Sequence, residues 1–356
     1  MRRIGLIGAG WITEAHAPGW EAAHERAKVV AVADPHDPSA TRLADRFGAR
    51  PFADYRRLLD EVPVDAVDIC VPPHLHVQIV SDVVERGIHV LCEKPVARDL
   101  AEADLIGQAI AAAGITYLPA HNTVHYPTIR RAHEYLTRGD LGPCLLLRSW
   151  DCDSEAVPTR LAVSPPPPEH REGNQWRASK STLGGGALID GGFHGVYRLL
   201  YLSANPVTEV SAMLGRFNPL LERDSEDTAA ILLRFSDGSL GEVVISYALD
   251  PPTTGPDRMF TASCRDGALS GNEAELQLRL ARWDTPSVQE LSGFRREIAW
   301  RETFKLEISH FLDVLDGLTA PIQTFDDARR ALELVRAAYE SAESGRTIAL
   351  PIGTPS

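Results

Sequence analysis

Short apolar runs alternate with longer amphipathic stretches through the first 120 residues of the chain. Five runs have the length and apolar content of buried strands, at residues 4–7, 29–33, 66–71, 89–92 and 116–118. Stretches with helical patterning separate them, near residues 12–26, 38–47, 75–86 and 100–113. Apolar strands separated by helices are typical of a parallel sheet that is covered on both faces. We therefore predict an α/β domain with a doubly wound parallel sheet over residues 1–122.

The pattern changes after Asn122. A helix is predicted after Pro127 and a strand near residues 145–150, followed by a long irregular segment with four consecutive prolines at 165–168. A segment of this kind is either a functional lid or arm or a disordered insert, and the sequence leaves both readings open.

Alternating apolar and polar residues between 207 and 280 predict antiparallel strands joined by tight turns. The turns and the helices that close the chain are predicted at 236–239, 265–268, 304–318 and 326–344. Residues 123–356 are therefore predicted to form a second, α+β domain with a largely antiparallel sheet.

Length and composition limit the class of protein. A chain of 356 residues is too long for one ordinary core, so two domains are expected. No apolar run approaches the roughly 20 residues that span a bilayer, and the strand at 4–7 leaves no room for a signal peptide. The five cysteines form no Cys-x-x-Cys pair, and the net charge of −13 argues against nucleic acid. We expect a cytoplasmic enzyme with no membrane or nucleic-acid partner.

Two glycines of a dinucleotide fingerprint follow the first predicted strand. Gly8 allows a tight turn, and Gly10 lets the backbone approach a pyrophosphate at the positive end of the next helix. Thr13 stands where a third glycine or an alanine is usual. The strand before and the helix after the turn favour cofactor contacts from Gly8, Gly10, Trp11 and Ile12; a tight turn in another kind of α/β protein is the alternative.

Asp34 ends the second predicted strand, about 20 residues after the glycines. A carboxylate there accepts both hydroxyls of an adenosine ribose and repels a 2′-phosphate, so NAD is favoured over NADP. The alternative is a helix cap before Pro35. The loop after the third strand leaves a strand C-terminus, where such sheets bind ligands, so Val71, Pro72 and His76 are expected to line the cofactor. His76 could instead cap a helix or face solvent.

The tripeptide Glu93-Lys94-Pro95 leaves the fourth predicted strand. Because Pro95 keeps Lys94 out of the helical conformation, the backbone sets the direction of the lysine. A lysine in a cleft supplies positive charge where an alkoxide develops during hydride removal. Glu93 would orient the lysine or bind a ribose of the cofactor. A surface Lys–Glu pair is the alternative.

Asp190 and His194 lie four residues apart and share one face of a helix. A histidine can take the hydroxyl proton as hydride leaves, because its ordinary pKa lies near working pH. The aspartate would hold the imidazole or a substrate hydroxyl, and the preceding glycines at 184–186 would allow backbone to approach the ligand. A capping aspartate next to an unrelated histidine is the alternative.

Together these residues resemble the glucose–fructose oxidoreductase/inositol dehydrogenase (Gfo/Idh/MocA) family. The resemblance runs from Ile4 to the closing helices and rests on Glu93-Lys94-Pro95 and on Gly-Gly-Gly-x-Leu-x-Asp-x-Gly-x-His. It implies an N-terminal Rossmann domain and a C-terminal domain whose open sheet often forms dimers or tetramers. It implies that the catalytic residues are Lys94, Asp190 and His194. It also implies three residues that lie near the nicotinamide or the substrate: Asn122, Trp176 and Arg177.

One residue departs from the family pattern. Tyr197 stands where many members carry an aspartate three residues after the histidine, so the substrate pattern differs, and we expect Tyr197 and His121 to face the substrate. His121 and His125 form a His-x-x-x-His pair. Pro127 follows closely and no third ligand is evident, so no metal site is predicted.

These features predict an NAD-dependent dehydrogenase that acts on a secondary hydroxyl of a sugar, sugar derivative or cyclitol. His194 would be the base, Lys94 would stabilise the oxyanion, and Asp190 would orient His194 or the substrate. Three alternatives remain: a regulator that binds dinucleotide and sugar without turnover, an enzyme that recycles a tightly bound cofactor, and a glycoside-cleaving enzyme that works by oxidation and elimination.

Overall fold

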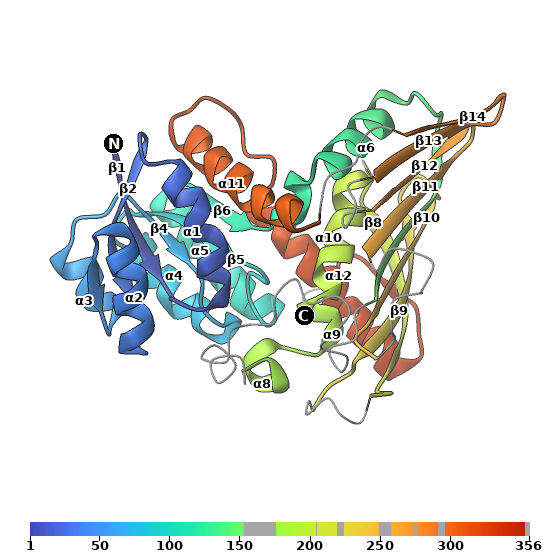
Figure 1. Cartoon of the computed structure of the whole chain (residues 1–356). Coiled ribbons are helices and arrows are strands. Elements are labelled where there is room, and N and C mark those ends of the chain that lie inside the picture. Colours follow the sequence, from blue (N-terminus) through green and yellow to red (C-terminus); the bar gives the residue numbers. More distant parts are fainter. Residues whose placement is uncertain are drawn as a thin grey trace.

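A computed structural model describes residues 1–152, 176–203, 205–218, 224–248, 258–272, 277–290 and 296–352. Two β-sheets dominate it, with a layer of helices between them (Figure 1). The predicted proline-rich segment at 165–168 lies outside the described residues, as does the start of the loop that leads to Trp176.

The first sheet has six parallel strands in the order β3-β2-β1-β4-β5-β6. The strands are β1 (Arg2–Ile7), β2 (Ala27–Ala33), β3 (Arg50–Phe52), β4 (Ala66–Ile69), β5 (His89–Glu93) and β6 (Tyr117–Ala120). This order reverses between β1 and β4 and confirms the predicted doubly wound Rossmann domain. The sequence pattern missed β3, because three edge residues with a central proline carry no periodic signal.

Helices cover both faces of this sheet, which explains why its strands are apolar throughout. Ile4 and Leu6 of β1 pack on one side with Trp20, whereas Ile7 packs on the other with Val80. The helical elements of this half are α1 (Trp11–Ala22), α2 (Asp37–Phe47), α3 (Tyr55–Glu61), η1 (Pro73–Leu75), α4 (His76–Val84), α5 (Leu100–Ala113), η2 (Asn122–His125) and α6 (Pro127–Arg138). All the predicted helices are present, and α3 is an additional one.

The second sheet has nine strands in the order β14-β13-β12-β11-β7-β10-β9-β8-β15. They are β7 (Cys144–Cys152), β8 (Val207–Gly215), β9 (Thr228–Phe235), β10 (Leu240–Ser246), β11 (Arg258–Cys264), β12 (Gly267–Asn272), β13 (Gln277–Arg282), β14 (Thr285–Glu290) and β15 (Ile348–Ala349). All neighbours are antiparallel except β7 and β10, which confirms a largely antiparallel sheet with the two predicted turns. The sheet extends beyond the predicted 207–280, because β7 enters its centre and β15 its edge.

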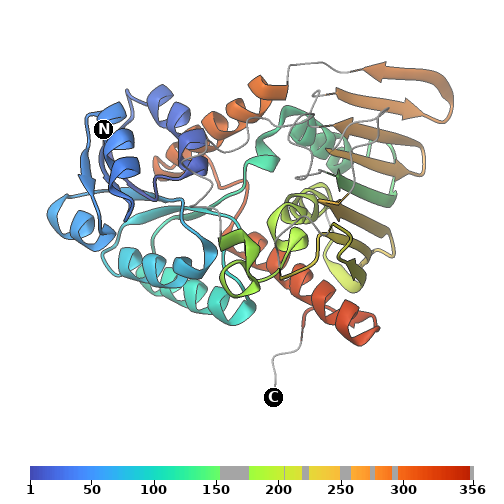
Figure 2. The same ribbon diagram turned by 60° about the horizontal axis from the view of Figure 1, so that its bottom comes forward.

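Helices lie on one face of the second sheet only (Figures 1 and 2). The remaining helices are α8 (Lys180–Leu183), α9 (Ala187–Asp190), α10 (Gly192–Leu202), α11 (Arg296–Leu315) and α12 (Phe325–Ser344). Within the described residues the other face carries no helix, and alternate residues of β9 are exposed there, Leu232 to 63%. This is the open sheet that the resemblance implied.

The long helix α11 returns from the second sheet to the Rossmann sheet. Ile308 and Phe311 join the core formed by α1 and β1, on the same face as Trp20. Gly19 makes this approach possible, because a Cβ there would lie 2.5 Å from Ile308 Cδ1. A division of the chain at residue 122 therefore follows the two sheets but not the cores. No helix in the described part of the chain has both the length and the apolarity to cross a membrane.

Candidate active site

The glycine turn after β1 has two different local environments. Gly8 has φ +97°, and a Cβ there would lie 2.3 Å from the Cys70 carbonyl oxygen, so a side chain is excluded. At Gly10, which precedes α1, a Cβ would meet nothing within 4 Å, so the helix N-terminus is open to a ligand. The Thr13 hydroxyl donates to the Gly8 carbonyl at 2.9 Å and is fully buried. A threonine in place of the third glycine therefore stabilises the turn without blocking the phosphate side.

Asp34 holds backbone at the end of β2. Its carboxylate accepts the N–H of Ala9 at 2.7 Å and the N–H of His36 at 2.7 Å, so it ties the glycine turn to the start of α2. Asp34 does not cap α2, because the N-cap is His36 and the carboxylate accepts the N–H of that residue rather than one within the helix. The ribose prediction does not compete with these contacts, because each carboxylate oxygen has a second lone pair and Asp34 is only half-buried.

His76 requires a reinterpretation. Its side chain is fully buried, with Nδ1 3.1 Å from the Val96 carbonyl and Nε2 3.0 Å from the Val71 carbonyl. Burial lowers the pKa of His76. The neutral ring can donate to one of these carbonyls and packs between the two loops rather than facing a cofactor, a role that its position in the sequence did not reveal. Val71 and Pro72 are half-exposed at the end of β4, where the predicted cofactor contact remains open to them.

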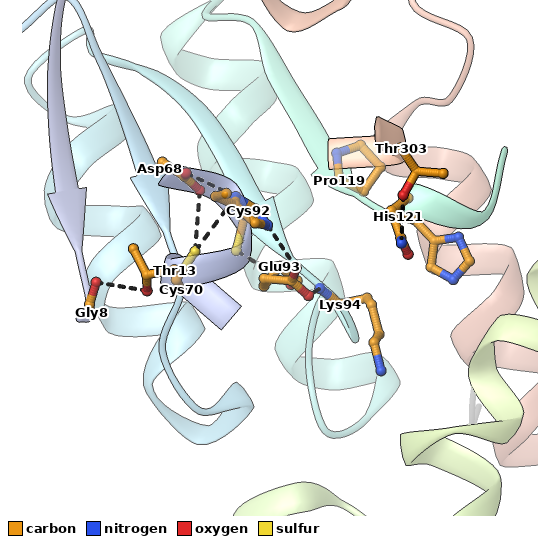
Figure 3. A network of polar contacts seen from close by, with 12 residues as sticks. Gly8, Thr13, Asp68, Cys70, Cys92, Glu93, Lys94, Pro119, His121 and Thr303 are labelled. Atoms are coloured by element: carbon orange, nitrogen blue, oxygen red, sulfur yellow. Dashed lines mark hydrogen bonds and ion pairs between the residues drawn. The ribbon is translucent and has the colours of Figure 1, made fainter. Parts of the chain in front are cut away.

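Glu93 and Lys94 connect the two domains at the end of β5. One Glu93 carboxylate oxygen accepts the backbone N–H of Lys94 at 3.0 Å, so Glu93 orients the lysine through its backbone. The Lys94–Pro95 peptide bond is cis. The Lys94 side chain leaves the Rossmann sheet (Figure 3), and its Nζ donates to the Asp190 carbonyl at 3.0 Å.

Asp190 and His194 occupy successive helices joined by Gly191, whose φ of −77° and ψ of −38° continue the helical turn. The buried Asp190 carboxylate forms an ion pair with Arg177, and Arg177 also lies over the Trp176 ring at 4.6 Å. His194 Nδ1 lies 3.1 Å from the Thr123 hydroxyl. Lys94 therefore reaches the backbone of Asp190, one helical turn before His194, and Thr123 is a partner of His194 that sequence reasoning missed.

The glycines before Asp190 have a different role from the predicted one. A Cβ at Gly185 would lie 2.0 Å from the Tyr339 hydroxyl, and one at Gly186 would lie 2.1 Å from the Glu226 carbonyl oxygen. The Gly186 N–H also donates to the Glu226 carboxylate at 3.0 Å. These glycines bring the backbone close to the protein's own side chains, so the prediction of close approach to a ligand was wrong for them.

His121 and Tyr197 form a buried aromatic stack next to His194. The His121 and Tyr197 rings are stacked at 4.0 Å, and the His121 and His194 ring centroids lie 4.9 Å apart. Within the described structure, neither His121 ring nitrogen nor the Tyr197 hydroxyl has a hydrogen-bond partner. Burial lowers the pKa of His121 well below its ordinary value, and Lys94 lowers it further. His121 is therefore a neutral ring with unused polar atoms beside the proposed base.

Asn122 faces α11 rather than the open centre of the site. Its amide Nδ2 donates to the Thr303 hydroxyl at 3.0 Å, and both residues are buried (Figure 3 labels Thr303). At the other end of the site, Trp300 of α11 stacks on Trp11 with ring centroids 5.3 Å apart. The sequence pattern contained no signal for either α11 contact, because the paired residues are distant in the chain.

Comparison with known proteins identifies the family of this chain. A family described as "Oxidoreductase family, NAD-binding Rossmann fold" matches residues 2–121, and the "GFO/IDH/MocA C-terminal domain" matches residues 129–270. The chain belongs to the Gfo/Idh/MocA oxidoreductases. The sequence-based family assignment is confirmed, and the chain is an NAD-dependent oxidoreductase.

Relatives of this Gfo/Idh/MocA oxidoreductase act on sugars and cyclitols. Levoglucosan dehydrogenase of Pseudarthrobacter phenanthrenivorans is 29% identical over 67% of this chain and 66% of the relative. Myo-inositol 2-dehydrogenase of Thermotoga maritima is 24% identical over 98% of both chains. A solved structure of levoglucosan dehydrogenase with NADH and levoglucosan is 25% identical and superposes with a TM-score of 0.85 over 98% of this chain and 99% of that chain.

The residues at the first sheet fit NAD. The unobstructed Gly10 and the positive N-terminus of α1 form a cradle for a pyrophosphate, and Asp34 stands at the end of the neighbouring strand.

Replacing Asp34 by alanine is expected to raise the Kd for NAD about tenfold and to reduce discrimination against NADP. The carboxylate would no longer repel a 2′-phosphate or accept ribose hydroxyls. Titration of both cofactors by protein fluorescence measures this. Asp37, an acidic residue in the first turn of α2, is the matched control: its alanine variant should keep both affinities. Unchanged discrimination in Asp34→Ala would leave Asp34 only its hydrogen bonds to the backbone of Ala9 and His36.

The buried histidine His125 predicts a loss of stability in acid. Burial, together with the charges of His310 and Arg130, lowers the pKa of His125 to about 3. Below pH about 6.5 the unfolded chain binds a proton at this histidine and the native protein does not. Each unit by which the pH decreases below about 6.5 therefore lowers the free energy of unfolding by roughly 1 kcal/mol. Urea unfolding of wild type and His125→Phe between pH 7 and 5 checks this, since the variant should lose less stability. The exposed His24 serves as the control for the same substitution, and parallel curves for all three proteins would contradict the assignment.

Proposed function

We propose that this oxidoreductase transfers hydride between NAD and a secondary hydroxyl of a sugar, sugar derivative or cyclitol. One observation carries the proposal: the Lys94 ammonium from the Rossmann domain donates to the Asp190 carbonyl from the second domain at 3.0 Å, one helical turn from His194. A cation and a base thereby meet at the C-terminal edge of the nucleotide-binding sheet, where such folds bind their ligands.

In this proposal each residue has a separate task during oxidation. His194 takes the hydroxyl proton, and its ring is oriented by the Thr123 hydroxyl at 3.1 Å. Lys94 stabilises the negative charge that develops on the substrate oxygen. Asp190 holds Arg177 over the site, and His121 and Tyr197 offer polar atoms to further substrate hydroxyls. NAD, when bound, supplies the acceptor for the hydride, and reversal reduces a ketone.

The substrate class is supported by the site and by the relatives. Levoglucosan and myo-inositol, which the relatives' names give as substrates, both present several secondary hydroxyls on a ring. The neutral His121 and the ion-paired Arg177 provide donors and acceptors of the kind that a polyol needs.

The test is NADH formation by the purified protein with NAD and a panel of inositols, aldoses, uronates and glycosides, with NADP in parallel. Turnover on any polyol with NAD supports the proposal. NADH-free turnover that exchanges hydride between two sugars, with cofactor released on denaturation, would favour internal recycling. Bound cofactor and bound sugar without any turnover would favour a regulator. Release of an aglycone from a glycoside would favour oxidation and elimination.

We also propose a cytoplasmic homodimer or homotetramer. All five cysteines are free, as suits a reducing compartment. Strand register places Met213, Leu232 and Trp150 on the same open face of the second sheet, where they are 80%, 63% and 44% exposed. Large exposed apolar side chains on an open sheet face favour a protein interface.

Replacing Leu232 by glutamate is expected to shift the assembly toward monomer, because it places a charge in the proposed apolar interface. Light scattering coupled to gel filtration measures the mass. Leu105 on α5, 53% exposed in the first domain, is the matched control for the same substitution. A monomeric wild-type protein would contradict the assembly proposal.

A further inference from the structure

A buried line of polar groups runs through the Rossmann domain to the lysine. His16 of α1 is fully buried, with Nδ1 2.9 Å from the Asp68 carboxylate and Nε2 3.1 Å from the Glu93 carboxylate. The second Glu93 oxygen accepts the Lys94 N–H. Figure 3 shows Asp68, Glu93 and Lys94 following one another toward the second domain. The hydride-transfer roles proposed above do not use His16 or Asp68.

With both carboxyls ionised, the two contacts of His16 need a charged ring. A neutral imidazole has one N–H and can donate to only one carboxylate, whereas an imidazolium donates to both. Burial opposes the charge, but the charge and hydrogen bond of the Asp68 carboxylate favour it, and the pKa of His16 is raised well above its ordinary value. The ring is therefore a buried cation between two carboxylates, the arrangement in which a buried charge is best compensated.

The other groups that face this ring are neutral or donate to Asp68. Burial raises the pKa of the Cys70 thiol to about 12, and the thiol donates to Asp68 at 3.3 Å. The Trp20 indole N–H donates to the same carboxylate at 2.8 Å. From α11, burial raises the pKa of Glu307 well above its ordinary value, and the Phe304 ring lies 5.0 Å from the His16 ring. His16 is thus the cation that balances Glu93 from inside the domain.

We propose that His16 is a positioning residue for hydride transfer: it holds the Glu93 carboxylate in the orientation that fixes the Lys94 backbone and aims the Lys94 ammonium. This inference rests on the role of Lys94 in the proposed function. Without His16, Glu93 can turn away or take up a proton, and the N–H of Lys94 loses its fixed acceptor. Misplacement of a catalytic group by about 1 Å can cost roughly a hundredfold in rate.

A metal ion is the competing interpretation of part of this cluster. Ligand atoms of His16, Asp68 and Cys70 lie within 4.8 Å of one another. The indole and thiol protons already occupy Asp68, and the thiol would have to lose its proton to bind a cation. The hydrogen bonds therefore favour a network without an ion.

The test uses His16→Asn in the full-length enzyme, with the hydroxyl substrate found by the panel. We expect kcat to fall about ten- to a hundredfold, with the Kd for NAD and the substrate KM within about threefold of wild type. Trp20→Phe is the matched control, because it removes another donor to Asp68 from the same buried helix face without touching Glu93. Its kcat should stay within about twofold.

A double-mutant cycle tests whether His16 acts through Glu93. If it does, His16→Asn/Glu93→Gln will be no slower than the slower single variant, because both changes break one linkage. Multiplicative losses would overturn the proposal, as would equal losses in His16→Asn and Trp20→Phe. A Lys94→Ala enzyme measured alongside separates the two ideas: full activity there defeats the lysine role, whereas a slow Lys94→Ala with a normal His16→Asn defeats only the present inference.

Two measurements on the wild-type enzyme remain decisive if the variants fail to fold. Nitrogen NMR of labelled histidine should show both His16 ring nitrogens protonated at neutral pH, and a neutral ring would overturn the proposal. Elemental analysis of the purified protein should find no stoichiometric metal. One equivalent of a metal ion bound at His16 in place of its hydrogen bonds would also overturn the proposal.

Discussion

Lys94→Ala is expected to lower kcat about a hundred- to a thousandfold while leaving the Kd for NAD within about threefold. A preorganised donor aimed at developing negative charge typically contributes this much, and the Lys94 ammonium is already held at the Asp190 carbonyl. We expect NAD to bind mainly through the open N-terminus of α1 at Gly10, which the substitution leaves in place. Steady-state NADH formation with the panel substrate, and fluorescence titration of NAD, measure the two quantities.

Lys28 provides the control for this experiment, because it is exposed on β2 and remote from the glycine turn. Lys28→Ala should retain wild-type kcat. A Lys94→Ala enzyme with kcat within tenfold of wild type would remove the lysine from the proposed chemistry, whatever the fate of its cofactor affinity.

His194→Asn is expected to reduce kcat about a hundred- to ten-thousandfold, the usual contribution of a general base. Asparagine can keep a hydrogen bond to the Thr123 hydroxyl, which now lies 3.1 Å from Nδ1, but it cannot accept the substrate proton. Thr123→Val should cost less, since it removes only the orientation of the ring. Single-turnover kinetics with NAD and substrate separate a slow chemical step from slow release.

His133 is the matched control for the histidine variant. It also contacts α10, through the Tyr201 carbonyl at 2.8 Å, but lies away from Lys94 and Asp190. His133→Asn should keep kcat near that of wild type. Retention of fast proton transfer in His194→Asn would point to another base, with the nearby His121 the first to test.

Local patterns in the sequence determined the elements and several backbone features of the site. Continuously apolar strands indicated that both faces of the first sheet are buried. Alternation of apolar and polar residues indicated that only one face of the second sheet is buried. Gly8 and Glu93-Lys94-Pro95 could be recognised because their conformations depend on immediate chain neighbours. The edge strand β3 escaped prediction, since three residues that include Pro51 make no period.

The sequence did not determine which groups surround each side chain. His76 looked like a cofactor ligand by position, yet its ring is buried between two carbonyls of the protein. The glycines at 184–186 looked like a ligand cradle, yet the space beside Gly185 and Gly186 is taken by Tyr339 and Glu226. Small and polar residues tolerate several environments, so their spacing cannot say which environment surrounds them.

The sequence alone therefore determined the family and the cofactor class and predicted candidate residues for the chemistry, because each depends on short motifs and on periodic burial. The fold had to bring Lys94 to Asp190, Thr123 to His194 and His16 to Glu93, since each pair comes from elements that lie far apart in the chain. Periodicity reports which side of an element is buried, whereas the packing of distant elements selects the atoms that meet there.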